Sequence, residues 1–231
     1  MDEKQLMHPE EIEWYERQKR LWDYMQSEEL ESLAAGLQLF LDQHAQVHMT
    51  DGKQSLAEST LVGLSDEHWR LKLGEGKNSI AWLIWHNARI EDVTFNLLVV
   101  DGSQVFDDWF EQLGFDRRKV GTGMGDEEVL EISSTIHLPA LREYWAAVGR
   151  RTQQVARTLD PVILKERLEP RNIQRLFDEG AVTQNLAGLA QWWSERTRGE
   201  LLFQPVSRHA FTHLHEIRQM RETLLAHSVG S

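Results

Sequence analysis

Residues 79–100 read SIAWLIWHNARIEDVTFNLLVV, and this stretch decides the fold class. Its apolar stripe consists of Ile80, Leu83, Ile84, Ile90, Val93, Leu97 and Val100. Apolar residues at this three-and-four spacing mark one face of an α-helix. We expect Asn78 to cap the start of this helix and Asp101-Gly102 to end it. The stretch therefore predicts a long amphipathic helix that packs through one wide side.

Working outward, the same periodicity recurs in four more segments of the chain. They are Glu10–Gln26, Leu30–His48, Leu138–Leu159 and a last run that Pro205 begins and His227 ends. Turn residues fill a connector at 50–77 and two long connections at 101–136 and 160–204. No run alternates like a β-strand. The sequence predicts an all-α four-helix bundle with long crossover connections (28–231), preceded by a helical extension (1–27).

The composition is that of a globular chain. Of 231 residues, 41% are hydrophobic and 27% are charged, which suits one domain with an appended segment. No apolar run reaches the roughly 20 residues that a membrane span needs. The first residues, Met1 to Gln5, lack the basic and apolar regions of a secretory signal. We therefore expect a cytoplasmic protein without a membrane partner.

Charge and cysteine content narrow the function classes. The 25 basic and 37 acidic residues give a net charge of -12, which disfavours binding to the phosphates of nucleic acid. The chain has no cysteine, so thiolate metal sites and cysteine nucleophiles are excluded. Any metal must be bound by histidine, aspartate or glutamate. The ten histidines are therefore the residues to place first.

Three histidines are predicted to point into the bundle. His86 lies on the apolar stripe of the helix at 79–100, a place also typical of a core histidine with one hydrogen bond. His209 and His213 are four residues apart on the last helix, so both rings share one face and can share one cation. His215 falls on the solvent side and is not a candidate. Together, His86, His209 and His213 are the expected metal ligands.

A second pair has the same spacing and competes with the first. His44 and His48 lie four residues apart near the end of the helix at 30–48. Gln43, Gln46 and the turn at Asp51-Gly52 favour a fraying, solvated helix end. We therefore expect this pair to lie at the surface and to bind no metal.

These motifs resemble those of the DinB-like, YfiT-type family of helical bundles. The resemblance rests on residues 63–67 (GLSDE), 79–86 (SIAWLIWH) and 209–216 (HAFTHLHE), and it extends over about 28–227. It implies that one histidine near the middle of helix 2 and an H-x3-H pair on helix 4 bind a divalent metal. Carried over, these are His86, His209 and His213. Many members have a Gly-Gln step where this chain has His215-Glu216. The resemblance therefore predicts metal binding better than it predicts the substrate.

Three neutral imidazoles would leave a coordination position for water or substrate. Zinc or nickel is the first expectation, and iron, cobalt and manganese are alternatives. Glu91 or Glu216 would orient a ligand or move a proton, unless these carboxylates simply face water. The resemblance also implies thiol-dependent transferases or isomerases, in which a low-molecular-weight thiol binds at the open position.

Other motifs carry weaker predictions. Residues 121–125 (GTGMG) lack the lysine of a P-loop and follow no strand, so we expect a flexible lead into a helix at Asp126. Five tryptophans would either pack the core or line an apolar pocket: Trp82, Trp85, Trp145, Trp192 and Trp193.

Two functions follow from these residues. The first is a metal-dependent enzyme, a hydrolase or thiol transferase, that acts on a small molecule. The second is a non-catalytic module for binding or stress response, in which the ion staples two helices. The extension at 1–27 would cap the bundle or form the contact of a homodimer.

Overall fold

The computed structural model describes residues 9–49 and 55–228. The long helices are α1 (Pro9–Met25), α2 (Leu30–His44), α5 (Ile80–Glu91), which continues as the π-helix η2 (Asp92–Val99), α8 (Leu138–Ala156) and α12 (His209–Ser228). The shorter helices are α3 (Leu56–Leu61), α4 (Asp66–Arg70), η3 (Val105–Asp108), α6 (Phe110–Leu113), α7 (Asp126–Thr135), η4 (Pro161–Lys165), α9 (Pro170–Asp178), η5 (Gln184–Leu186), α10 (Ala187–Ser194), α11 (Arg198–Leu201) and the π-helix η6 (Leu202–Arg208). The described residues form no strand beyond an isolated bridge between Arg167 and Thr197. The predicted all-α class is confirmed.

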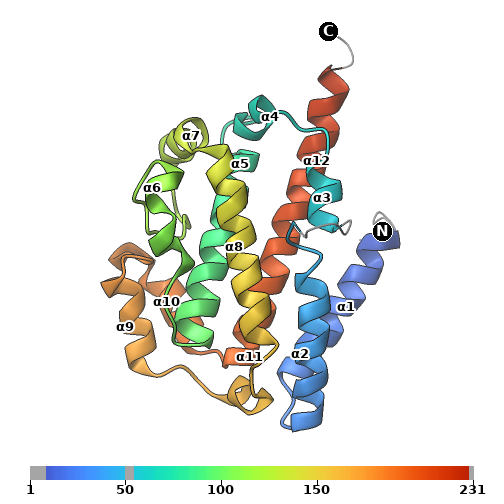
Figure 1. Ribbon diagram of the computed structural model, residues 1–231, viewed down its shortest axis with the longest axis vertical. Coiled ribbons are helices and arrows are strands. Elements are labelled where there is room, and N and C mark those ends of the chain that lie inside the picture. The colour runs from blue at the N-terminus through green and yellow to red at the C-terminus, as the bar shows by residue number, and fades with distance from the viewer. Residues whose placement is uncertain (1–8, 50–54, 229–231) are drawn as a thin grey trace.

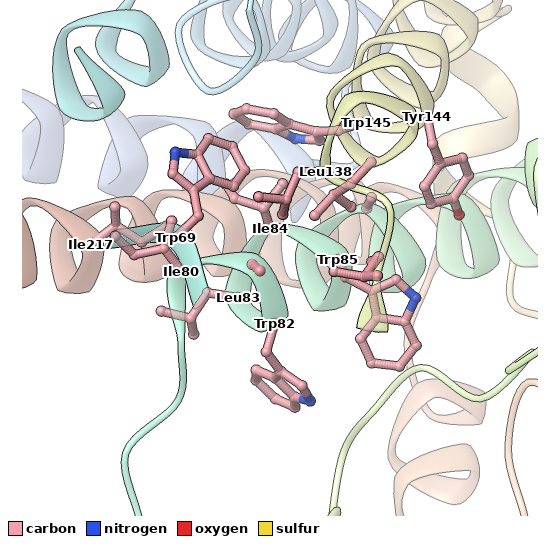
Figure 2. Close-up of a cluster of buried hydrophobic side chains, with 14 of the residues drawn as sticks. Trp69, Ile80, Trp82, Leu83, Ile84, Trp85, Leu138, Tyr144, Trp145 and Ile217 are labelled. Carbon is pink, nitrogen blue, oxygen red and sulfur yellow. The ribbon is translucent and has the colours of Figure 1, made fainter. Parts of the chain in front are cut away.

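The long helices pack side by side (Figure 1). α5 contacts α8 and α12, while α2 contacts α8, η6 and α1. Figure 2 shows Ile84, Leu138 and Trp145 gathered in the hydrophobic core between α5 and α8. α1 buries Leu21 and Met25 in a second apolar cluster shared with α2. The predicted helical extension thus packs as a further long helix, and its role in a homodimer stays a prediction.

The helix that decided the fold is buried all round. Ser79, one residue after the expected cap, accepts a hydrogen bond from the backbone of Trp82. Every residue of α5 and η2 is buried, so the one-sided amphipathic helix is wrong. Two of its buried polar side chains pair with each other, since Arg89 and Asp92 form an ion pair at 3.1 Å. Beyond η2, Asp101 has a positive φ of 51° and ends the helical segment before Gly102.

The last helix begins earlier than expected. The helical backbone runs from α11 at Arg198 through η6 into α12, so Pro205 lies inside it and not in its first turn. Proline removes a backbone donor and crowds the preceding turn of an α-helix. The wider π-helical turns of η6 hold this residue within a continuous helical path. The second long connection therefore ends near Thr197, where Thr197 caps α11.

Candidate metal centre

His86 lies in the second turn of α5. Its side chain is buried and stacks on Trp82, with ring centroids 4.7 Å apart. Its Nδ1 is hydrogen-bonded to the carbonyl oxygen of Val120. Because a carbonyl only accepts, Nδ1 must carry the proton of the neutral ring. The lone pair of Nε2 is therefore available to another partner.

The loop that supplies this carbonyl depends on Gly121. Gly121 has a φ of +92°, and a Cβ there would lie 2.7 Å from Trp85 and 3.1 Å from Nδ1 of His86. A side chain would push the loop away from the imidazole. The segment at 121–125 does lead into α7 as expected, but its first residue also lets the loop hold His86.

His209 and His213 lie in the first two turns of α12 and face His86. The Nε2 atoms of His86 and His209 are 3.1 Å apart. The ring centroids of His209 and His213 are 4.6 Å apart, and those of His86 and His213 are 5.4 Å apart. One ligand atom from each residue lies within 4.8 Å of the other two. The three rings that the sequence singled out thus converge, and their role as metal ligands is a prediction.

Glu216 fixes the orientation of His213. Its Oε2 accepts a hydrogen bond from Nδ1 of His213 at 2.9 Å. A carboxylate in this position keeps the proton on Nδ1 and leaves Nε2 free, as in the carboxylate–histidine–metal arrangement. The side chain of Glu216 is 37% exposed, so this carboxylate is neither buried nor free in water. Of the two expected carboxylates, Glu216 is the one beside the triad.

Burial keeps the imidazoles of His86 and His209 uncharged. Burial first and the neighbouring His213 second lower the pKa of His86 to about 3, against the raising effect of its hydrogen bond to Val120. Burial, with the fields of His86 and His213, also holds the pKa of His209 well below its ordinary value. Nδ1 of His209 is buried without a hydrogen-bond partner among the described residues. Neutral rings with converging nitrogens fit a divalent first-row cation such as zinc or nickel.

His215 lies outside this group. It is partly buried, and its Nε2 is 3.0 Å from the side-chain nitrogen of Gln219. The three-residue group that gathers around His86 does not include it. His215 was expected on the solvent side; it is partly exposed and lies outside the group around His86.

The competing pair at the end of α2 is buried, which corrects the surface expectation. His44 and His48 are 0% and 4% exposed. Glu91, expected to serve the triad or face water, is instead hydrogen-bonded to both rings through its two oxygens. By spacing, these three side chains also could hold a metal ion. The signal was present in the sequence, because His44 continues the buried stripe of Leu33, Leu37 and Phe40.

The tryptophans have different roles. Trp85, Trp145 and Trp193 are buried in the core, whereas Trp82 covers His86. Trp192 lines a cavity of about 450 Å³ between α1, α10 and α12, together with Trp14, Tyr15, Trp22, Phe203 and Phe211. Arg208, Phe211 and Thr212 line this cavity, but His209 and His213 do not. The aromatic cavity and the triad thus lie on different faces of α12.

The helical architecture and the histidine cluster define a class of all-α protein with a candidate internal metal site. The family model of the DinB superfamily matches residues 49–217, so the chain belongs to the DinB superfamily. The match contains all three histidines of the triad and leaves α1 and α2 outside. A search of curated proteins finds no match. Within the described residues, no helix is both long enough and apolar enough to cross a bilayer.

Proposed function

We propose that this DinB-superfamily protein is a metal-dependent enzyme whose ion is held by His86, His209 and His213. The observation that carries the proposal is the set of hydrogen-bond partners of Nδ1, the ring nitrogen that would face away from the ion. Val120 and Glu216 place protons on Nδ1 of His86 and His213. Nε2 then carries the lone pair in both rings, and Nε2 of His86 lies 3.1 Å from Nε2 of His209.

Three protein ligands leave a coordination position for another molecule. The side chain of His213 is 18% exposed, so the triad can be approached from its α12 side. A zinc or nickel ion, when bound, would supply Lewis-acid activation of a water molecule or a thiol. The chain itself would hold the rings in place through Val120 and Glu216 and exclude water on the Trp82 side.

The reaction class is a hydrolysis or a thiol-dependent transfer on a small molecule. Because the chain has no cysteine, a low-molecular-weight thiol would be a separate substrate or cofactor. Proton transfer would fall to Glu216, which is in hydrogen-bond contact with His213. Glu91 is not available for this role because its oxygens are bonded to His44 and His48. The cytoplasmic location remains a prediction from the sequence.

A non-catalytic role is favoured by one observation. The triad joins α5 to α12, which are far apart in sequence, through rings that are largely buried. An ion in this position would staple the two helices and stabilise the fold, as structural metal sites do. The enzyme proposal predicts an ion that can be removed with little loss of stability, whereas the staple predicts unfolding.

The experiment compares metal content, stability and activity in one set of variants. Wild type, His86→Ala and His209→Ala are purified without chelator and measured by mass spectrometry and thermal melting, with His215→Ala as the matched control. p-Nitrophenyl acetate tests hydrolysis, and cysteine with N-ethylmaleimide tests thiol transfer. We expect the tightly bound ion and any metal-dependent rate to be lost together in the first two variants and kept in His215→Ala. Retention of the full wild-type metal content by His86→Ala would contradict the proposal.

A further inference from the structure

A second set of metal-type donors lies on another face of α5. Nε2 of His44 is 2.8 Å from Oε1 of Glu91, and Nε2 of His48 is 2.7 Å from Oε2. All three side chains are at most 5% exposed. Two imidazoles and one carboxylate form the ligand set of His₂Glu zinc sites and of the iron(II) facial triad.

The carboxylate of Glu91 is buried without a lysine or arginine partner among the described residues. Its hydrogen bonds come from His44, His48 and Thr152. Arg89, two positions away, is bonded to Asp92 and Tyr144 and does not serve Glu91. A buried carboxylate needs an opposite charge. A divalent cation between the two rings and the carboxylate would supply it.

Residues around the three donors hold them in position. The hydroxyl of Thr152 donates to Oε1 of Glu91, as outer partners of ligating carboxylates do. Gly149 makes room for His48, since a Cβ at this position would lie 2.5 Å from Nδ1. That Nδ1 is buried and has no hydrogen-bond partner in the described part of the chain. It can carry the ring proton once an ion replaces the hydrogen bond from Nε2 to Glu91, which leaves Nε2 free for that ion.

Gln153 determines which nitrogen of the His44 ring carries the proton. Its side-chain nitrogen is 2.9 Å from the carbonyl of Leu41 and 3.0 Å from Nδ1 of His44. Its oxygen accepts from Arg157. The amide therefore donates to Nδ1, and the proton of neutral His44 lies on Nε2, where an ion would bind.

Turning the amide of Gln153 would reverse this arrangement. The amide oxygen would then accept a hydrogen bond from Nδ1–H, and Nε2 of His44, no longer bonded through a proton to Glu91, would be free for an ion. The carbonyl of Leu41 keeps its hydrogen bond from the backbone of Ala45 in either case. Rotating the Gln153 amide therefore breaks only the hydrogen bonds of that amide, which is partly buried.

We propose that His44, His48 and Glu91 form a second divalent-cation site, separate from the triad and weaker, whose affinity is set by the orientation of Gln153. The site takes zinc or iron(II). It does not depend on the enzymatic proposal, because it shares no residue with His86, His209 and His213.

The test titrates Zn²⁺ into metal-free full-length protein by calorimetry, with native mass spectrometry to count bound ions. In wild type we expect two ions, one tight and one weaker. The double variant His209→Ala/His213→Ala should keep the weaker ion. Adding Glu91→Gln to that variant should abolish it. If the double variant binds no zinc, or if Glu91→Gln does not affect its ion, the second site is refuted.

The variant Gln153→Glu tests the proposal more directly in the same titration, because it leaves every proposed ligand in place. A carboxylate at 153 can only accept, so it should hold the proton of His44 on Nδ1. We expect zinc binding at the second site to tighten about tenfold or more, the scale of outer-partner effects. Gln153→Ala, which neither donates nor accepts, is the matched control and should tighten it less. Should the double variant fail to fold, the second phase of the wild-type titration carries the same comparison, and an unchanged phase in Gln153→Glu would refute the proposal.

Discussion

The triad (His86, His209 and His213) and the Glu91 cluster (His44, His48 and Glu91) use similar side chains on two faces of α5. They differ in which ring nitrogens of the histidines carry the protons. Each has two histidines four residues apart and one further donor on α5. In the triad, Nδ1 of His86 faces a carbonyl and Nδ1 of His213 faces a carboxylate. In the cluster, Nδ1 of His44 faces an amide nitrogen. By distance alone, both groups could hold a metal ion, whereas the outer partners leave Nε2 unprotonated in His86 and His213 but not in His44.

The largest effect is expected from removing a triad ligand. His86→Ala should weaken zinc binding at the triad by about a thousandfold, or about 4 kcal/mol, because a direct ligand is worth more than the 10–100-fold of an outer partner. Competition with a chromogenic chelator measures the affinity. Equal zinc affinity in wild type and His86→Ala would contradict the proposed difference between the triad and the second site.

The next effect concerns stability at the cluster. Glu91→Gln should lower the free energy of unfolding of the metal-free protein by about 3 kcal/mol, because an amide cannot accept from two rings and a hydroxyl at once. Urea denaturation followed by circular dichroism gives the value. The control is Glu216→Gln, which changes a half-exposed carboxylate and should alter stability by less than about 0.5 kcal/mol. Similar losses in both variants would contradict the account.

Acid should destabilise the metal-free protein through His86. Its pKa is lowered from 6.5 to about 3 in the folded state, so the unfolded chain binds the extra proton between these values. Stability from this group is complete above pH 6.5 and falls as the pH decreases toward 3. At pH 5.5 the loss should be about 1 kcal/mol. Urea midpoints of wild type and His86→Asn at pH 7.5 and 5.5 test this, and an identical pH dependence in both would count against it.

An effect of similar size is expected at Glu216. Glu216→Gln removes the carboxylate that holds the proton on Nδ1 of His213 and should weaken zinc binding at the triad about tenfold. Calorimetry on the metal-free protein measures it. The second site should not respond, since Glu216 has no contact with it. A change at both sites would mean that they are coupled.

The sequence predicted the helices and the triad because both follow from spacing. The helix at 79–100 and the pair His209 and His213 depend on local spacing, which holds in the folded chain, although the burial of every face of that helix did not follow from its stripe. The burial of Glu91 and His48 depends on contacts with Thr152 and Gly149, which are far away in sequence. The π-helices are likewise a product of packing, so the position of Pro205 inside η6 was not predictable.

The most direct test is long-range nitrogen–proton NMR of the histidine rings in metal-free protein at neutral pH. This measurement reports which ring nitrogen carries the proton. We predict the Nδ1–H form for His86 and His213 and the Nε2–H form for His44. Nε2–H at His86, or one common form for all three rings, would contradict the claim that the outer partners separate the two sites.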